Sequence, residues 1–376
     1  MLKKNLKVAL VHDFLIQYGG AERVLEVMAE MFPDAPIYTL LHDREKMRGK
    51  FENRQIHTSF LQKFPKFLRK RYRWLLPLFP VAPETFDLRD YDLIISSSGA
   101  WSKGIVTKLN TKHIAYIHSP MRFVWDYSEK YLAENRKEKL NFFIRPLLTY
   151  LRIWDKSAAD RPDYLIANSK YTKDRIEKYY RRKSIAIYPP VGSLSLIRPS
   201  GTFSQGEKGK KEGYFLIVSR LSAYKRINCV IEAFNKLELP LIIIGEGGER
   251  KHLESIANKN IRFLGWLPDE KISKYYENAR AFIFPTVDDF GIAPVEAMMH
   301  GVPVLAIRKG GAKEIVSEGI TGEFFGAQTA EVVADCIRRF MEKEKEYDRQ
   351  VIINKAQEFS KERFKRELEE YINHIA

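Results

Sequence analysis

The sequence predicts an α/β protein of two domains, each built on a doubly wound parallel sheet. Its 376 residues are more than one hydrophobic core usually organises. Short apolar runs alternate with helical patterns along both halves of the chain, as expected for parallel sheets. A polar stretch between the halves, PSGTFSQGEKGKKEG, has the glycine, serine and lysine content of a linker.

The first half begins with LKVALVHDF, a continuous apolar run typical of a buried parallel strand. QYGGAERVLEVMAEMFP follows, with apolar residues at helical spacing and a proline that ends the helix. Further strands are predicted at DLIISSS, HIAYIHS and YLIANS. We place this domain at 1–198 and the linker at 199–213.

The second half repeats the pattern, and we place it at 214–358. The predicted strands are YFLIVSRL, LPLIIIGEGG, IRFLGWL, ARAFIFP and VPVLAI, and INCVIEAFNKL is a predicted helix. A last helix at 359–376 carries an apolar stripe at Phe364, Leu368 and Ile372. This stripe must be buried against something, and the first domain is one candidate.

Composition limits the environment and the partners. The chain has 63 Lys and Arg against 48 Asp and Glu, a formal charge of +15, which favours nucleic acid, acidic lipid or phosphorylated ligands. No apolar run approaches the ~18 residues that span a bilayer. The N-terminus leads into a strand pattern and lacks a signal-peptide cleavage site. Cys229 and Cys336 lie in helical patterns, where we expect buried free thiols, consistent with a reducing cytoplasm.

One basic stretch differs from an ordinary solvated surface. Between residues 53 and 83 there are seven Lys or Arg residues and no acid, interleaved with aromatic and aliphatic side chains. We expect it to rest on an anionic membrane surface; the alternative is a solvated helix whose aromatics pack in the core. The expected contact residues are Lys63, Lys66, Arg69, Lys70, Arg71, Arg73 and Trp74.

The segment FIFPTVDDFGIAPVEAMMHGVPVLA predicts an anion site. A strand leads into a loop with Asp288, and a helix then begins near Ile292. Free N–H groups at Gly291, Ile292 and Ala293 would bind an anion at the helix N-terminus. Glu296, one turn in, can accept hydrogen bonds from ribose hydroxyls. The same segment also fits a helix start with ordinary acidic capping.

Three other segments carry candidate residues just after strands. SRLSAYKRIN contains Arg220 just after a strand and Lys225 five residues later. The forked guanidinium of an arginine and the compact ammonium of a lysine suit binding of two phosphates, although such residues are often only solvated. VHDFLIQYGGAERV places Gly19 and Gly20 at a loop that a phosphate or sugar can approach. IAYIHSPMRFVWDY places His118 after a strand. A lone histidine there is usually structural.

Together these segments resemble the family-four GT-B glycosyltransferases, whose fold has two facing Rossmann-like domains with a cleft between them. The resemblance rests on two acids with seven residues between them, on the Arg–Lys clamp, on the glycine pair and on the histidine. It extends through ANSKYT, IYPPV, FLGWLPDE and GGAKEIVSEGITGEFF, from about Lys7 to Phe364. The family usually has two glutamates, whereas this chain has Asp288 in the first place and Glu296 in the second.

The resemblance implies a retaining transferase that takes a hexose from a nucleotide-sugar and needs no cofactor. Asp288 and Asp289 are similar to a D-x-D metal motif, but Arg220, Lys225 and the helix N-terminus already supply positive charge, so we expect a metal-independent enzyme. Asp288 and His118 would then act on the transferred sugar, while Arg122 and Trp125 would lie on the acceptor side. The string HSPMRFVWD resembles bacterial surface-polysaccharide mannosyltransferases, which implies GDP-mannose and a lipid-linked or oligosaccharide acceptor at the inner membrane face. The residues themselves do not distinguish guanine from uracil.

Three alternatives stay open from the sequence. The first is a transferase of the same fold that uses a UDP- or dTDP-sugar. The second is a nucleotide-sugar epimerase, which would convert the donor without any acceptor. The third is a basic nucleic-acid-binding protein, which would bind polynucleotide tightly and a nucleotide-sugar weakly. The clustered donor motifs favour the transferase.

Overall fold

The computed structural model describes residues 6–128, 138–192 and 213–375, and within it the chain divides into two compact units. Unit 1 comprises the chain up to Pro190 together with Lys361 onward, and unit 2 runs from Val191 to Ser360. The expected linker at 199–213 lies outside the described residues except for Gly213. Each unit contains a parallel sheet, so the predicted α/β class with two Rossmann-like domains is confirmed.

Unit 1 is built on a seven-stranded sheet in the order β3-β2-β1-β4-β5-β6-β7. Its strands are β1 Val8–Leu15, β2 Ile37–His42, β3 Ile56–Thr58, β4 Leu93–Ser98, β5 Lys112–Ile117, β6 Tyr164–Ala167 and β7 Ile185–Ala186. Its helices are α1 Gly20–Met31, α2 Arg44–Met47, α3 Lys66–Lys70, α5 Glu138–Ala158, α6 Lys170–Tyr180 and α14 Lys361–Ile375. The described part of unit 1 also contains 3-10 turns at Phe60–Lys63, Tyr72–Leu78, Ala82–Thr85 and Ser102–Gly104.

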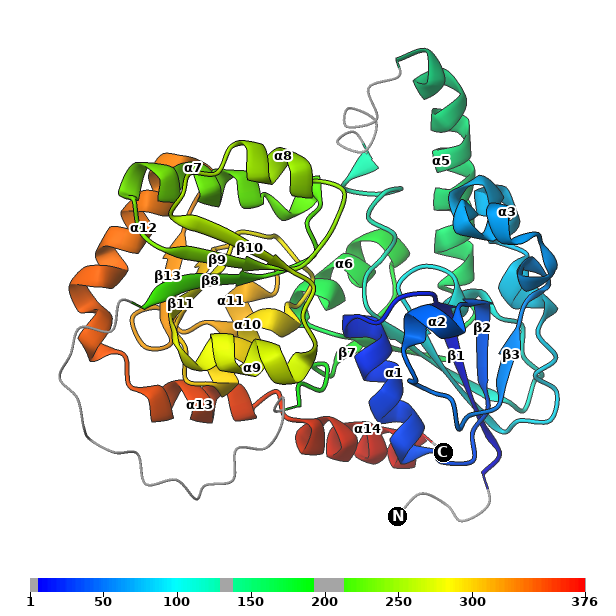
Figure 1. Cartoon of the computed structure of the whole chain (residues 1–376). Helices are drawn as coiled ribbons and strands as arrows, with labels where there is room; N and C mark the ends of the chain where they lie inside the picture. Colours follow the sequence, from blue (N-terminus) through cyan, green and yellow to red (C-terminus); the bar gives the residue numbers. More distant parts are fainter. Residues whose placement is uncertain (1–5, 129–137, 193–212, 376) are drawn as a thin grey trace. The chain divides into compact units, whose positions relative to one another are not determined.

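The last helix, α14, is part of unit 1. Phe364, Leu368 and Ile372 of its stripe are buried in the same apolar cluster as Val24 and Met28 of α1. Figure 1 shows α14 beside α1. Burying three such side chains contributes about 1.5–3 kcal/mol each, which accounts for the return of the chain to this unit after residue 360.

Unit 2 contains a six-stranded sheet in the order β10-β9-β8-β11-β12-β13. Its strands are β8 Tyr214–Val218, β9 Leu241–Ile244, β10 Ile261–Gly265, β11 Ala279–Phe284, β12 Val304–Ile307 and β13 Gly322–Phe325. Its helices are α7 Ile227–Leu237, α8 Arg250–Ser255, α9 Asp269–Glu277, α10 Ile292–Met299, α11 Ala312–Ile315, α12 Ala330–Lys343 and α13 Arg349–Gln357, with 3-10 turns at Ala223–Lys225 and Glu344–Glu346.

The core of unit 2 forms where α7 and α12 pack on the sheet. Phe215 of β8, Phe234 of α7 and Phe340 of α12 are fully buried and pack edge to face. Cys229 and Cys336 lie in the same cluster as buried free thiols, as the sequence predicts. Burial raises the pKa of both thiols, to about 11 and about 12, so neither is a reactive thiolate at neutral pH.

Both sheets share the feature that positions the candidate sites. In unit 1 the strand order reverses between β1 and β4, and in unit 2 it reverses between β8 and β11. At such a point the connections leave toward opposite faces of the sheet, which opens a crevice at the carboxyl ends of the two strands. The predicted site residues of each unit therefore belong at this crevice.

Candidate active site

In unit 2, the loops that follow β8 and β11 carry the predicted donor residues. Arg220 lies two residues beyond β8 with an exposed side chain, and Lys225 ends the short 3-10 turn before α7. Asp288 lies in the loop between β11 and α10. Because β8 and β11 are paired neighbours in the sheet, these two loops meet at the reversal point.

Lys225 and Asp288 form an ion pair across these loops. The Lys225 Nζ lies 2.6 Å from Asp288 Oδ2, with side chains 13% and 23% exposed. Burial alone would lower the pKa of Lys225, but the Asp288 carboxylate and Tyr224 outweigh it and the pKa is raised. Thr286 Oγ1 donates to the Lys225 carbonyl at 3.2 Å, which fixes the two loops to each other. Lys225 is therefore a permanent cation at neutral pH.

The N-terminus of α10 lies at the same place. Gly291 precedes the helix with φ 113°, a backbone conformation that favours glycine. Pro294 occupies the first turn and Gly301 follows the helix end, as predicted. The first backbone N–H groups of the helix, at Ile292 and Ala293, have no carbonyl of a preceding turn to pair with and suit an anion.

Glu296 lies in the second turn of α10 and is only 5% exposed. Tyr276 of α9 donates its hydroxyl to Glu296 Oε2 at 3.2 Å. The backbone carbonyl of Glu296 lies 2.8 Å from Nδ1 of His300, whose Nε2 lies 2.7 Å from the Ser273 hydroxyl. The carboxylate is thus held in one orientation by α9.

Close glycine contacts shape the loop that carries Arg220. A Cβ on Gly245 would lie 1.9 Å from the Ser219 carbonyl oxygen, and one on Gly247 would lie 2.0 Å from that of Leu221. The Leu221 N–H donates to the Glu246 carbonyl at 2.9 Å. Glycine is therefore required at 245 and 247 for the backbone-to-backbone packing that supports the Arg220 loop.

In unit 1, a second group of polar residues lies at the reversal point between β1 and β4. His12 and Ser97 face each other in the register of the two strands. The Ser97 Oγ lies 3.1 Å from His12 Nδ1 and 2.8 Å from Nε2 of His118, which follows β5. His12 Nε2 lies 3.5 Å from Glu22 of α1. His118 was predicted from the sequence, whereas His12, Ser97 and Glu22 were not. The available signal for His12 and Ser97 was a polar residue inside an apolar strand, near its end.

Asp13, the residue after His12, was also missed. Its carboxylate accepts four backbone N–H bonds from residues 99–102, at 2.6–3.0 Å. These bonds hold the loop after β4 in place beside Ser97. Asp13 therefore fixes the loop that follows β4 at the reversal point of the sheet.

The predicted glycine pair begins α1 beside this group. Gly19 is the N-cap residue, and its N–H donates to Glu22 Oε2 at 2.8 Å. Gly20 is the first residue of the helix. Burial lowers the pKa of His118 to about 4, so its ring is neutral at physiological pH.

The segment after His118 is held by buried charges. Trp125 donates its indole N–H to Asp155 Oδ2 at 2.8 Å and stacks on Tyr179, with ring centroids 4.8 Å apart. Asp155 is fully buried and also accepts Lys103 Nζ at 2.5 Å and the Tyr180 hydroxyl at 2.8 Å. Trp125 thus has a structural anchor.

Arg122, the other expected acceptor-side residue, is half-buried in the same segment. Asp126, four residues on, accepts Nη2 of Arg175 at 2.8 Å, and Arg175 also donates to the Ser119 hydroxyl. The arginine thereby ties this segment to α6. The placement of Arg122 remains compatible with an acceptor-side role, which stays a prediction.

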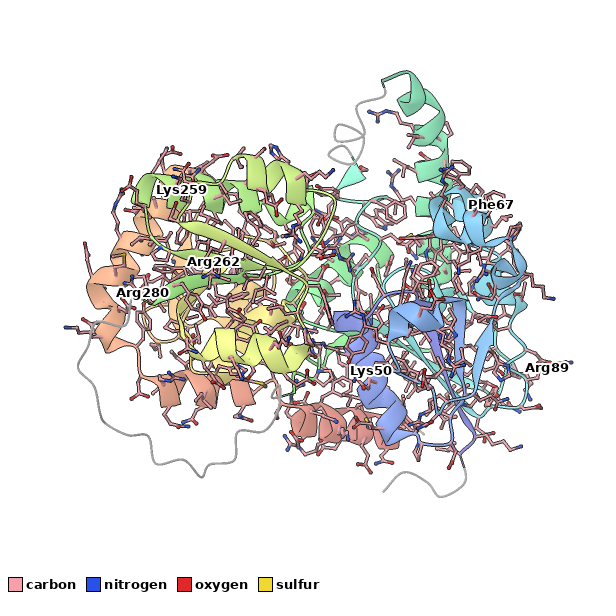
Figure 2. All side chains as sticks on the ribbon, in the orientation of Figure 1. Lys50, Phe67, Arg89, Lys259, Arg262 and Arg280 are labelled. Atoms are coloured by element: carbon pink, nitrogen blue, oxygen red, sulfur yellow. The ribbon has the colours of Figure 1, made fainter. Side chains whose placement is uncertain are left out.

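The basic aromatic stretch is divided between core and surface. Leu61, Leu75 and Phe79 are buried, whereas Phe67 and Trp74 are 62% and 65% exposed. Figure 2 labels Phe67 on α3. Among the expected membrane-contact residues, Lys63, Lys66, Arg71 and Trp74 are exposed and Arg69 is half-buried; the side chains of Lys70 and Arg73 lie outside the described part. The exposed part of the stretch is therefore smaller than the sequence pattern suggests.

Two structural features of the described residues bear on metal binding and on membrane insertion. No group of three or more His, Cys, Asp or Glu residues is arranged there to hold a metal ion. None of the helices in these ranges is both long and apolar enough to cross a bilayer.

The two units match two glycosyltransferase sequence families. Residues 18–191 match the Glycosyltransferase Family 4 model, and residues 202–359 match the Glycosyl transferases group 1 model. An uncharacterized glycosyltransferase of Methanocaldococcus jannaschii is 24% identical over 84% of this chain and 83% of its own. A GDP-mannose-dependent alpha-mannosyltransferase of Corynebacterium glutamicum is 31% identical over 28% of this chain and 25% of its own.

A solved structure matches nearly the whole chain. It is the Anabaena protein HepE in complex with UDP-glucose, which superposes with a TM-score of 0.69 at 18% identity, covering 98% of this chain and 100% of the other. At this identity the likeness establishes the fold.

Proposed function

Since the chain is a glycosyltransferase of the GT-B type, we propose that it is a retaining, metal-independent hexosyltransferase that transfers mannose from GDP-mannose to a lipid-linked or oligosaccharide acceptor of a surface polysaccharide. The observation that carries the proposal is in unit 2. A cation at Lys225, a carboxylate at Asp288 and the N-terminus of α10 meet where the strand order reverses.

Each of these groups has a role toward a nucleotide-sugar. Arg220 and Lys225 bind the diphosphate, aided by the free N–H groups at the start of α10. Glu296, oriented by Tyr276, accepts hydrogen bonds from the ribose hydroxyls. These positive groups neutralise the charge that grows on the diphosphate as the glycosidic bond breaks, which is the task a metal ion performs in other transferases.

The chemical step needs no protein nucleophile. The bond between the anomeric carbon and the phosphate oxygen breaks, and the acceptor hydroxyl attacks the same face of the short-lived oxocarbenium ion. Its proton passes to the departing phosphate oxygen, so the product keeps the donor's anomeric configuration. Asp288 stabilises the positive sugar, and His118 binds the sugar in unit 1. This differs from retaining glycosidases, which form a covalent intermediate on a carboxylate.

GDP-mannose is supported by two observations of likeness. The string from His118 to Asp126 resembles bacterial surface-polysaccharide mannosyltransferases. The Corynebacterium protein that matches part of the chain is named for its dependence on GDP-mannose. The second candidate is a UDP- or dTDP-sugar, favoured by the UDP-glucose bound to the Anabaena protein.

Transfer assays with purified protein distinguish these donors. The enzyme is given GDP-, UDP- and dTDP-hexoses with a lipid-linked sugar acceptor, in buffer with and without EDTA. We expect transfer from GDP-mannose, unaffected by EDTA, with a product whose anomeric proton matches the donor's configuration by NMR. An inverted product, or conversion of the donor without acceptor, would contradict the proposal.

We further propose that unit 1 rests on an anionic membrane surface through the exposed part of its basic stretch. Phe67 and Trp74 project beyond the core, and the Arg71 guanidinium lies 5.0 Å from the Trp74 ring. A cavity of about 540 Å³ adjoins the stretch and is lined by Lys66 and Arg69, among others. Basic side chains near such a surface contribute ~1 kcal/mol each, enough together for reversible attachment.

Flotation with liposomes tests this contact. Binding should rise with the content of anionic lipid, fall at high salt, and drop in the Phe67→Ser/Trp74→Ser variant. Leu109→Ser is the matched control, because Leu109 is fully exposed in the same unit and outside the stretch. Binding that ignores anionic lipid, or that Leu109→Ser lowers equally, would refute the proposed surface.

A further inference from the structure

The side chains around His118 form a series of polar contacts that ends at its ring: one ion-pair contact followed by two hydrogen bonds. Glu22 lies 3.5 Å from His12 Nε2, His12 Nδ1 lies 3.1 Å from Ser97 Oγ, and Ser97 Oγ lies 2.8 Å from His118 Nε2. Ser97 is fully buried, and His12 and Glu22 are 2% and 6% exposed. Solvent therefore does not satisfy these groups, and each must match its neighbour.

The direction of each hydrogen bond in this series follows from which protons each side chain can donate. The Glu22 carboxylate, which accepts the Gly19 N–H, faces His12 Nε2, so we place a proton on that nitrogen; a bare nitrogen there would oppose the carboxylate oxygens. His12 Nδ1 is then an acceptor and takes the Ser97 hydroxyl proton. Ser97 has no second proton to give, so it accepts from His118 Nε2–H.

We propose that Glu22, His12 and Ser97 are positioning residues that hold His118 as its Nε2–H tautomer and leave the Nδ1 lone pair for a hydroxyl of the substrate. Within the part of the chain that the structure describes, the hydrogen bond of the His118 ring is made through Nε2, to Ser97. The low pKa of His118, caused by burial, keeps the ring neutral and the lone pair available.

The consequence is a preference in substrate chemistry, and it rests on the function proposed above. A nitrogen that accepts pairs with a group that donates. A sugar hydroxyl donates, whereas a carboxylate or a phosphate oxygen cannot, and its negative charge would face a lone pair. His118 therefore selects a neutral hydroxyl at the position it contacts and rejects an anionic sugar there.

The same series of side chains connects His118 to the start of α1. The second oxygen of Glu22 accepts the N–H of Gly19 at 2.8 Å, so one carboxylate caps the helix and orients His12. The glycine loop and His118 are thereby linked through buried side chains only. Movement of α1 would alter the hydrogen bond that His118 can make.

Histidine NMR of the free protein measures the tautomer directly. Long-range proton–nitrogen correlations at pH 8, above the ordinary histidine range, report which ring nitrogen is protonated, and the His118→Gln variant identifies the signal. We expect Nε2–H in the wild type. Protonation at Nδ1 would overturn the proposal, because the hydrogen bonds would then run in the opposite direction, with His12 protonated on both ring nitrogens and Ser97 donating to His118 Nε2.

Two serine variants separate positioning from general stability. Ser97→Ala removes the hydroxyl in the chain, and Ser96→Ala removes an equally buried hydroxyl, 2.8 Å from His113 Nε2. Ser97→Ala should give His118 a mixture of tautomers and lower kcat/KM at least ~10-fold, the effect of one misplaced hydrogen bond. Ser96→Ala should leave the tautomer of His118 unchanged. An unchanged tautomer in Ser97→Ala refutes the positioning role. Because no donor is present during the NMR experiment, its outcome is independent of which sugar is transferred.

Discussion

Replacing Asp288 by Asn removes one charge from the candidate site at nearly constant shape. This carboxylate pairs with Lys225 at 2.6 Å, and both side chains are less than a quarter exposed. A donor diphosphate brings two phosphates to the same cation. The carboxylate is then available to the sugar, where positive charge develops as the glycosidic bond breaks.

The magnitudes follow from this geometry. A surface ion pair contributes ~0–1 kcal/mol and breaking a buried one costs ~3–5 kcal/mol, so losing this partly exposed pair should lower the free energy of unfolding by ~1–3 kcal/mol. Losing a preorganised charge next to the transition state costs ~10²-fold or more in kcat. Nucleoside diphosphate affinity should not fall, because the diphosphate replaces the lost negative charge beside Lys225.

Three measurements on the variant check these values. They are urea unfolding, steady-state transfer, and calorimetric titration with GDP. Asp288→Glu, which restores the usual residue of the resembled family, should stay active. Asp289→Asn is the control and should change transfer little. An active Asp288→Asn beside an inactive Asp289→Asn would show that the wrong acid was chosen, and indifference to both would remove the carboxylate from the mechanism.

Three other predictions follow from particular contacts. Arg220→Ala should lower kcat/KM by the equivalent of ~2–4 kcal/mol of transition-state stabilisation. The free energy of unfolding should change little because the Arg220 side chain is exposed, and a normal kcat/KM would place the diphosphate elsewhere. Asp155→Ala should lower the free energy of urea unfolding by ~3–5 kcal/mol because it leaves the buried Lys103 charge uncompensated. The double change Lys103→Met/Asp155→Leu should lower it less than Asp155→Ala does, and a larger loss in the double variant would contradict this explanation. Burial, assisted by Arg182, lowers the pKa of His113 to about 3, so as the pH falls the unfolded chain binds a proton before the folded chain does. The free energy of unfolding should therefore fall by up to ~1.4 kcal/mol for each pH unit on going from about pH 6.5 down to pH 3. His113→Gln should reduce that slope when unfolding is measured against pH, and an unchanged slope would refute the assignment.

The local structure around the candidate donor residues was predictable from the sequence because its signals are local. The segment around Asp288 contains its own strand, its Gly291 turn, its Pro294 first turn and its Gly301 end, all within a short span. The glycines of the GEGG loop are also visible in the sequence. Their role is not, because it depends on the Ser219 and Leu221 carbonyls of a separate loop.

The contacts of Glu22, His12 and Ser97 that lead to His118 were not predictable in the same way. His12 and Ser97 are 85 residues apart, and only the register of β1 and β4 brings them together. The same holds for Trp125, whose indole is fixed by Asp155 from a different element. Local patterns identify single polar residues near strand ends, whereas the pairing of strands decides which of them meet.

The basic stretch shows a further limit of pattern analysis. A continuous helix would place the aromatics of residues 60–79 on faces that can be read from their spacing. The chain instead forms a short helix between 3-10 turns, which interrupts the period. Phe79 is therefore buried while Trp74 is exposed, and no single periodicity predicts both.

Calorimetric titration with GDP and GMP tests the central claim, that unit 2 binds the diphosphate of a nucleotide-sugar through Arg220 and Lys225. The wild type should bind GDP at least ~30-fold more tightly than GMP, because the second phosphate gains a charge-assisted contact of about 2 kcal/mol. Arg220→Ala and Lys225→Ala should each lose most of that difference while binding GMP nearly as before. Equal affinity for GDP and GMP in the wild type, or an undiminished difference in both variants, would contradict the account.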